Sequence, residues 1–529
     1  MIYDFNKSNV YNKEGLFDTV KSTIHFFIGV IGEVFSGDNH LKIEQILNYV
    51  QKEEVDKLAG RYTIIFINKK MNTVKVYRDP TGLQTIYFMN ENRRVSISNK
   101  LSDFHLNLET VNVKYISQYL NNENYISDLT IYERIFRVRP GHVTTITDEK
   151  ISTKKFYKFK SSPIRYKNSS EYQEEFKVLF DRALKRSIQN VDKLGLSLSG
   201  GLDSTSIYAR MCAKNIFNED INLYSLCYPN NLDSDESIYI KETLSLYPSD
   251  NHKFINADDN WTFKEFEKDF SGFKEPFHFI GSNLNKTLLN AMKTDGITHH
   301  LTGHGGDDVL NVDIYYLNNL YKKNKHLKLV QELIKNRKKY TSSELIKAIK
   351  NEKTLQISNP YLLDPKRIQK NHFNWDEMDM DVYFESIINN SNTEWMDINI
   401  NAPINIEARY PFLDINLVEF LLNIPVEQKE QLSISKYILR NSFKNILPEK
   451  IYSRNTKSLN LPQLLLGLQK EKGNIMKYTN FECLNQYKKT NRQKIEKDIN
   501  DLSKSTNKTF YPIVNIAKLL SVEVWLRSK

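Results

Sequence analysis

The sequence predicts a two-domain α/β protein, with an antiparallel first domain followed by a parallel sheet flanked by helices. The length of 529 residues exceeds what one ordinary hydrophobic core holds. Residues 1–165 contain short β-branched and aromatic runs separated by turns. Over residues 166–529, helical periodicity alternates with short apolar strands, as in a parallel sheet. These two ranges are the predicted domains.

Short strands are expected throughout the first domain. Pro- and Gly-containing turns stand at Asp79–Gly82 and Arg139–His142, next to runs rich in β-branched and aromatic residues. Strands are expected at residues 62–67, 74–77, 85–88, 95–98 and 143–146. Because the strands are short and closely spaced, we expect them to pair antiparallel and to stack in layers.

The second domain is expected to open with a helix at residues 170–190. The apolar strand Leu194–Leu198, a glycine-rich turn and a helix that opens near Ser204 follow, and another strand is expected at residues 223–228. Residues 311–395 are polar and lysine-rich and are expected to form helices outside the sheet core. The C-terminal segment is expected to be mainly helical.

Composition indicates a globular protein of a reducing compartment. Hydrophobic residues make up 40% and charged residues 26% of the chain. Cys212, Cys227 and Cys483 lie too far apart for a metal motif or a disulfide framework, which favours free thiols in the cytoplasm. No targeting signal is visible, and the apolar run at residues 26–32 is too short to span a bilayer.

The formal charge of +10 comes mainly from lysines spread along the chain. A nucleic-acid groove would need basic residues clustered with aromatic ones. We therefore expect neither a nucleic-acid partner nor a membrane span.

One motif carries the chemistry: it follows a strand and opens a helix. Its glycines let backbone N–H groups turn toward an oxyanion, and the helix N-terminus adds partial positive charge. Asp203 places a carboxylate beside this phosphate site, which predicts a bridging Mg²⁺. The residues expected to bind the nucleotide here are Ser199, Gly200, Gly201, Leu202, Asp203, Ser204 and Thr205.

The motif differs from a Walker loop, because no lysine follows the glycines. It therefore favours binding of pyrophosphate as a leaving group of ATP over transfer of the γ-phosphoryl group. The alternative is that the two glycines form an ordinary flexible turn.

This loop resembles the pyrophosphate loop of the asparagine synthetase superfamily. Further matches to that family run in the same order from about residue 58 to 460: Arg78–Gly82, Arg139–His142, Asp235–Ser237, Leu301–Asp308, Glu407–Asp414, Lys436–Arg440, Leu447–Pro448 and Arg454–Lys457. The resemblance implies an N-terminal αββα-type domain similar to class-II glutaminases. It also implies a C-terminal PP-loop domain of the adenine-nucleotide α-hydrolase type.

The resemblance also implies the remaining site residues. Leu226 and the glycines of a second loop are expected to bind the nucleotide, and Asp307 is expected to share Mg²⁺ with Asp203. Lys457 is expected to stabilise charge on the pyrophosphate or on a tetrahedral intermediate, the alternative being a solvated surface lysine. The second-loop glycines are Gly303, Gly305 and Gly306.

The sequence departs from the family pattern at its N-terminus, and this departure indicates which members it resembles. Glutamine-using members have a nucleophilic cysteine at the N-terminus, whose own α-amine serves as the base. Here residue 2 is Ile2 and no cysteine precedes Cys212, so the first domain is expected to be inactive as a glutaminase. β-Lactam synthetases and lasso-peptide macrolactam synthetases also lack that cysteine. The insert at 311–395 and the segment Glu523–Arg527 resemble the lasso-peptide enzymes more closely.

In β-lactam synthetase-like enzymes a tyrosine and a glutamate help to deprotonate the amine. Alignment on the second glycine loop puts His304 at the tyrosine position, where a neutral imidazole can accept a proton. The alternative is a histidine that only shapes the loop. Glu394 is the candidate glutamate, and its alignment requires a gap of one residue.

The predicted reaction is AMP-forming amide synthesis with ATP and Mg²⁺, in which an activated carboxylate joins an amine of the same ribosomal peptide. Alternatives are an ammonia-dependent asparagine synthetase, a β-lactam-type small-molecule cyclase and a non-enzymatic scaffold. The expected partners are a peptide or small-molecule carboxylate substrate, a precursor-peptide protease and a leader-binding protein.

Overall fold

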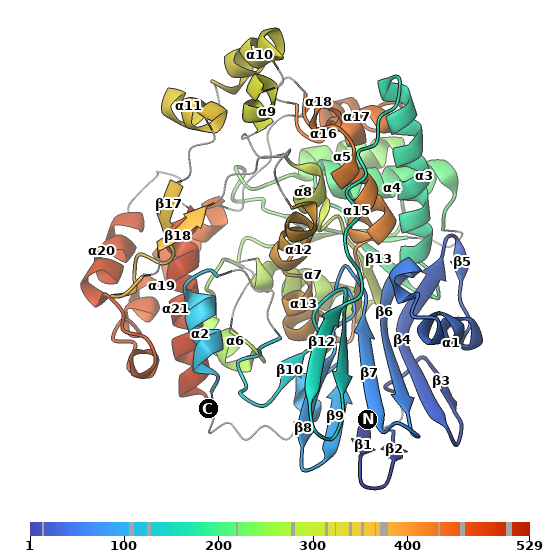
Figure 1. Ribbon diagram of the computed structural model, residues 1–529. Helices are drawn as coiled ribbons and strands as arrows, with labels where there is room; N and C mark the ends of the chain where they lie inside the picture. Colours follow the sequence, from blue (N-terminus) through green and yellow to red (C-terminus); the bar gives the residue numbers. More distant parts are fainter. Residues whose placement is uncertain are drawn as a thin grey trace.

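The computed structural model shows a two-domain α/β protein and confirms the predicted fold class (Figure 1). It describes residues 1–12, 15–104, 111–123, 128–217, 221–276, 281–312, 316–322, 324–337, 341–350, 354–365, 367–370, 379–431, 434–454, 461–503 and 510–529.

The first domain consists of two stacked antiparallel sheets. In spatial order, one sheet contains β10 (Phe136–Arg137), β8 (Tyr87–Glu91), β9 (Arg94–Ser98), β1 (Ile2–Asp4) and β2 (Asn9–Tyr11). The other contains β12 (Ile151–Lys155), β11 (His142–Ile146), β7 (Thr73–Arg78), β6 (Ala59–Asn68), β4 (Phe26–Ser36) and β3 (Thr19–Ser22), and β5 (Asn39–His40) pairs with β4.

Alternating apolar residues give the second of these sheets two buried faces. Ile65 and Ile67 on β6 point into a core shared with Ile97 of the other sheet. Ile64 on the opposite face packs with Ile46 of α1 (Ile43–Gln51). The period of two along the strand therefore sets a helix–sheet–sheet layering.

The helix α2 (Val113–Leu120) of the first domain lies beside α21 (Phe510–Arg527), near the end of the chain (Figure 1). The ammonium of Lys518 lies 5.1 Å from the ring centroid of Tyr119, and the ring of Trp525 meets Tyr132 edge-on. This helix thus belongs to the core that joins the two domains.

The second domain is built on a five-stranded parallel sheet. Its spatial order is β15 (His252–Asn256), β14 (Asn222–Cys227), β13 (Leu194–Ser197), β16 (His299–Leu301) and β19 (Glu407–Arg409). The chain adds β14 and β15 on one side of β13 and then returns to add β16 and β19 on the other. The order therefore reverses between β13 and β16, which is where open α/β sheets bind ligands.

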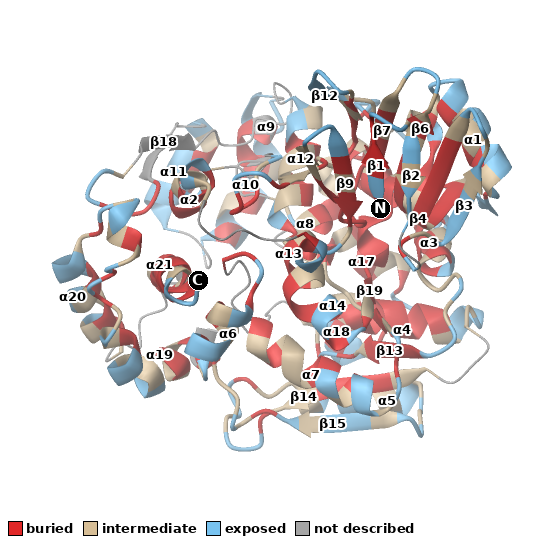
Figure 2. Ribbon diagram, turned by 90° about the horizontal axis from the view of Figure 1, so that it is seen from below, coloured by how far each residue is buried: buried red, intermediate tan, exposed pale blue. Residues whose placement is uncertain are grey.

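Helices cover this sheet and extend the second domain beyond it. They are α3 (Ser169–Ser187), α4 (Leu202–Lys214), α5 (Ser237–Leu246), α6 (Phe266–Gly272), α7 (Ser282–Thr294), α8 (Gly306–Leu310), α12 (Met380–Asn390), α13 (Thr393–Met396), α14 (Ala402–Ile404), α15 (Ile415–Asn423), α16 (Val426–Lys429), α17 (Tyr437–Ser442), α18 (Glu449–Ser453), α19 (Leu461–Met476) and α20 (Arg492–Leu502). Figure 2 shows that α4 is largely buried, whereas α20 exposes much of its surface.

The insert expected at 311–395 contains helices α9 (Tyr316–Lys322), α10 (His326–Asn336) and α11 (Ser342–Lys350), which share a small core of their own. It also contains a hairpin of β17 (Thr354–Ile357) and β18 (Arg367–Lys370), which the sequence did not predict. Among the described residues, no helix is long and apolar enough to cross a membrane.

Candidate functional site: two glycine loops at the switch of strand order

The two glycine motifs meet at the carboxyl edge of the parallel sheet. β13 leads into the first loop and then α4, whose N-cap is Gly201. β16 leads into the second loop and then α8, whose N-cap is Gly305. Because β13 and β16 are neighbouring parallel strands, their loops lie side by side at the point where the strand order reverses.

Hydrogen bonds within the first loop fix its shape. Ser199 Oγ and Ser204 Oγ share a hydrogen bond of 2.9 Å, and the backbone N–H groups of Ser199 and Gly201 donate to these two hydroxyls. The buried Thr205 hydroxyl has no hydrogen-bond partner in the described part of the chain. The loop therefore leads into an ordered helix N-terminus, a suitable arrangement for an oxyanion.

The glycines of the second loop are required by close packing against the first loop. A Cβ on Gly303 would lie 2.8 Å from the Ser204 backbone nitrogen, and one on Gly306 would lie 2.7 Å from Asp203 Oδ1. Gly305 has a φ of +90°, which disfavours any residue with a side chain. These residues thus hold the two loops in direct contact.

The two predicted metal ligands, Asp203 and Asp307, converge on a single cation, the Lys436 ammonium. Lys436 Nζ lies 2.7 and 2.5 Å from the two carboxylate oxygens of Asp203 and 2.7 Å from Asp307 Oδ1. Both carboxylates reach one position, so together they could hold a cation there. The described residues contain no cluster of three or more potential ligands, so nucleotide and water oxygens would complete a Mg²⁺ shell here.

His304 is held by the backbone of the segment that precedes α13. Its Nε2 donates to the Ser391 carbonyl at 2.5 Å, and its ring meets the Tyr410 ring edge-on at 5.9 Å. With the proton on Nε2, the acceptor nitrogen of a neutral ring is Nδ1. This is the atom that would take a proton if His304 is the base.

Glu394 lies in an ion cluster between the domains. Its carboxylate pairs with Arg78 at 2.8 Å and Arg137 at 3.0 Å, both from the first domain, and Arg137 also pairs with Glu275. Burial pushes the pKa of Glu394 upward, but the two guanidinium charges prevail and hold that pKa below its usual range. The carboxylate therefore stays ionised and is a weak proton acceptor, and its assignment as a base remains a prediction.

Two further predicted site residues are Leu226 and Lys457. Leu226, near the end of β14, is partly buried against Tyr228, Ala257 and Leu284. Lys457 lies outside the described residues, so its assignment also remains a prediction.

Two basic residues that border the loops have no role that the sequence predicted. Besides Lys436, Arg454 donates to the Gly200 carbonyl at 2.8 Å, pairs with Glu236 at 2.8 Å and stacks 4.0 Å from the Tyr239 ring centroid. Both residues belong to the C-terminal segments that resemble the family. Their place in those segments could have suggested a role in the site, although it does not indicate which residues they contact.

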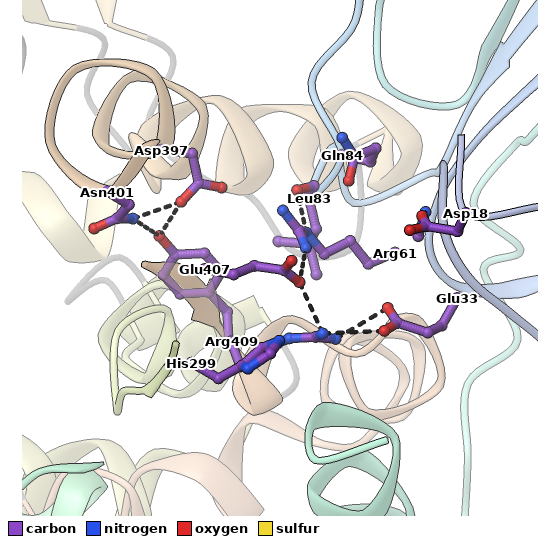
Figure 3. Close-up of polar contacts among 12 residues, drawn as sticks. Asp18, Glu33, Arg61, Leu83, Gln84, His299, Asp397, Asn401, Glu407 and Arg409 are labelled. Carbon is purple, nitrogen blue, oxygen red and sulfur yellow. Dashed lines mark hydrogen bonds and ion pairs between the residues drawn. The ribbon is translucent and has the colours of Figure 1, made fainter. Parts of the chain in front are cut away.

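A second ion network joins the domains next to β19. Figure 3 shows Arg409 in a bidentate pair with Glu33 of β4, with both distances at 3.0 Å. It also shows Arg61 of β6 bonded to Glu407. On the far side of this network, the buried Tyr410 hydroxyl donates to Asp397 at 3.0 Å. Burial raises the pKa of Asp397 to about 6.

Comparison with known proteins agrees with this geometry. The model of the asparagine synthase family matches residues 175–527, and that of the glutamine amidotransferase domain matches residues 39–157.

Relatives of known name are distant. The chain is 22% identical over 460 residues to the glutamine-hydrolysing asparagine synthetase 1 of Bacillus subtilis, covering 78% of this chain and 69% of that protein. It is 22% identical over 394 residues to a putative glutamine-hydrolysing asparagine synthetase 1 of Methanocaldococcus jannaschii, covering 73% and 60%. With the glutamine-hydrolysing asparagine synthetase 3 of Bacillus subtilis, it shares 21% identity over 475 residues, covering 84% and 73%. Since the first family model matches more than half of the chain, the protein belongs to the asparagine synthase family of ATP-dependent carbon–nitrogen ligases.

Proposed function

We propose that this protein activates a peptide carboxylate with ATP and joins it to an amine of the same peptide, closing a macrolactam ring. The observation that carries the proposal is the convergence of Asp203 and Asp307 on one cation position beside a helix N-terminus. A phosphate group and its counter-ion need these two features together.

The proposed first step forms an acyl-adenylate. A substrate carboxylate oxygen attacks the α-phosphorus of ATP, and pyrophosphate leaves. The first glycine loop and the start of α4 bind the departing pyrophosphate through N–H and hydroxyl donors. Asp203 and Asp307 would hold Mg²⁺, which neutralises phosphate charge when it is bound.

In the second step, the amine nitrogen attacks the acyl carbon, the C–O bond to AMP breaks, and the amine loses a proton. His304 Nδ1 is the proposed acceptor of that proton. Lys457 is proposed to stabilise the negative charge that develops during attack.

The absence of one cysteine supports an amine that belongs to the substrate itself. No cysteine precedes Cys212, so the first domain lacks the thiol that hydrolyses glutamine in the glutamine-using members. An amine carried by the substrate itself removes the need for that reaction. We propose a precursor-peptide protease and a leader-binding protein as partners, and the cytoplasm as the site of action.

An ammonia-dependent asparagine synthetase is the second candidate. It is favoured by the names of the three relatives, two of which are asparagine synthetases and one a putative asparagine synthetase. A β-lactam-type cyclase that acts on a small molecule is the third candidate.

One set of assays separates these reactions. The purified protein is incubated with ATP, Mg²⁺ and either candidate peptides or aspartate plus ammonium. AMP, pyrophosphate and a peptide that has lost one water support the macrolactam reaction, whereas asparagine supports the second candidate. Formation of ADP in place of AMP would refute adenylation.

A further inference from the structure

The side chain of Lys436 occupies the position where the proposed magnesium ligands meet. It is 7% exposed, and its three oxygen contacts to Asp203 and Asp307 lie between 2.5 and 2.7 Å. Two carboxylates and one ammonium leave this cluster with a net charge of −1. The ammonium thus neutralises half of the carboxylate charge without any metal.

The backbone around Lys436 holds the ammonium in this place. Lys436 is the N-cap of α17 and adopts a φ of +55°. One turn later, Arg440 donates to the carbonyls of Ser435, Tyr452 and Arg454 at 2.9, 2.5 and 2.7 Å. Arg440 therefore ties Ser435, the residue before Lys436, to the end of α18, and this fixed backbone directs the lysine side chain between the loops.

We infer that Lys436 is a positioning residue that fills the metal position in the nucleotide-free protein, so that a divalent cation enters only together with ATP. The inference rests on the proposed Mg²⁺–ATP site. A divalent ion alone would have to displace a buried ammonium that already has good partners. MgATP brings both a replacement cation and phosphate oxygens with which the displaced ammonium can pair.

The test measures binding of Mn²⁺, as a spectroscopic substitute for Mg²⁺, to the nucleotide-free full-length protein. Lys436→Met removes the charge and keeps a similar volume, so it should bind Mn²⁺ more tightly than the wild type by about tenfold or more. Lys436→Arg keeps the charge and should bind like the wild type. Adding Asp203→Asn to Lys436→Met should cancel the gain.

Lys450→Met is the matched control. Lys450 is an exposed lysine that pairs with Glu242 at 2.7 Å, so its loss should leave Mn²⁺ affinity unchanged. Thermal unfolding verifies that each variant is folded. If the folded Lys436→Met protein gains no affinity for Mn²⁺, the inference is wrong.

A measurement on the wild type keeps the test decisive even if Lys436→Met does not fold. Nucleotide-free wild type should bind Mn²⁺ no better than the Asp203→Asn variant, because the ammonium already occupies the aspartates. Binding that depends on Asp203 in the absence of nucleotide overturns the inference.

The outcome is separable from that of the proposed function. ATP–pyrophosphate exchange by the wild type reports adenylation and does not require Lys436 to compete with a metal. Exchange without the Mn²⁺ effect rejects only the inference. The Mn²⁺ effect without exchange for any carboxylate rejects only the proposed reaction.

Discussion

At the scale of single residues, Asp203 connects the first glycine loop both to Lys436 and to the second glycine loop. It lies in the first turn of α4, pairs with Lys436 and packs against Gly306 of the second loop. Asp203→Asn should lower ATP–pyrophosphate exchange by about a hundredfold or more, since a proposed metal ligand and its charge are both lost. The melting temperature should also fall, because Lys436 stays buried with Asp307 as its remaining carboxylate partner, so exchange is measured at a temperature at which the variant is folded. Asp38→Asn, at an exposed carboxylate paired with Arg182, is the matched control, and equal exchange rates in the two variants would contradict the metal assignment.

His300 should make stability depend on pH. It is a buried residue of β16, and neither ring nitrogen has a hydrogen-bond partner in the described structure. Burial lowers the pKa of His300 to about 4, with a smaller electrostatic contribution from the neighbouring His304. The unfolded chain, with its ordinary pKa near 6.5, therefore binds the proton first as pH falls.

The stability that neutral His300 contributes is complete above about pH 6.5 and is lost as the pH falls toward 4. At pH 5 the loss should be about 2 kcal/mol relative to pH 8. His300→Phe should remove this component. Denaturant unfolding at both pH values checks it, and an equal pH response in the two proteins would be the contrary result.

Individual contacts were the hardest features to predict from sequence. The chemistry of Ser199–Thr205 is local, because one stretch of residues specifies the strand end, the turn and the helix start. The partner of Asp203, in contrast, is 233 residues away, and nothing in the sequence near Lys436 indicates that its ammonium faces two carboxylates. Glu394 shows the same limit, since its alignment could not reveal the arginines that hold it.

At the scale of elements, the two glycine loops act as one unit because their backbones touch. Gly306→Ala would place a Cβ 2.7 Å from Asp203 Oδ1, which forces the loops apart. We expect a loss of stability of about 1–3 kcal/mol and weaker use of ATP. Gly473→Ala is the matched control, because that helical glycine of α19 has open space around it and alanine should stabilise the helix by about 0.5–1 kcal/mol. Melting curves and the KM for ATP compare the two, and identical effects would argue against loop contact.

Element types followed from the sequence where the periodicity was strong. The helix expected at 170–190 is α3, and the strand expected at 223–228 is β14. The hairpin β17–β18 was missed because each strand has only four residues and lies in a polar, lysine-rich insert. The five-residue π-helix Asp397–Asn401 was also missed, because its register depends on the tertiary contact between Asp397 and Tyr410.

At the scale of the whole molecule, the first domain supplies counter-charges to the second. Glu33, Arg61, Arg78 and Arg137 all pair with residues of the second domain. The Glu33–Arg409 pair spans 376 residues of sequence, which is why the interface could not be predicted. This dependence gives the first domain a structural role in the interface.

Glu33→Gln should destabilise the protein by about 3 kcal/mol, because it weakens a bidentate pair and leaves Arg409 buried with excess charge. Glu44→Gln breaks the exposed pair with Lys21 at 3.1 Å and should cost much less stability, because solvent screens that pair. Urea unfolding compares the two variants. Equal costs would show that the interdomain pair does not stabilise the interface.

The contact between α2 and α21 joins one of the first helices of the chain to the last one described. Trp525 is 1% exposed and donates to the Phe273 carbonyl at 3.1 Å, so the late helix fills a space that earlier segments leave apolar. During synthesis on the ribosome, α2 emerges long before the helix that covers it. The nascent polypeptide must therefore carry an unshielded apolar surface through most of its translation, and a chaperone that binds such surfaces has its longest opportunity here.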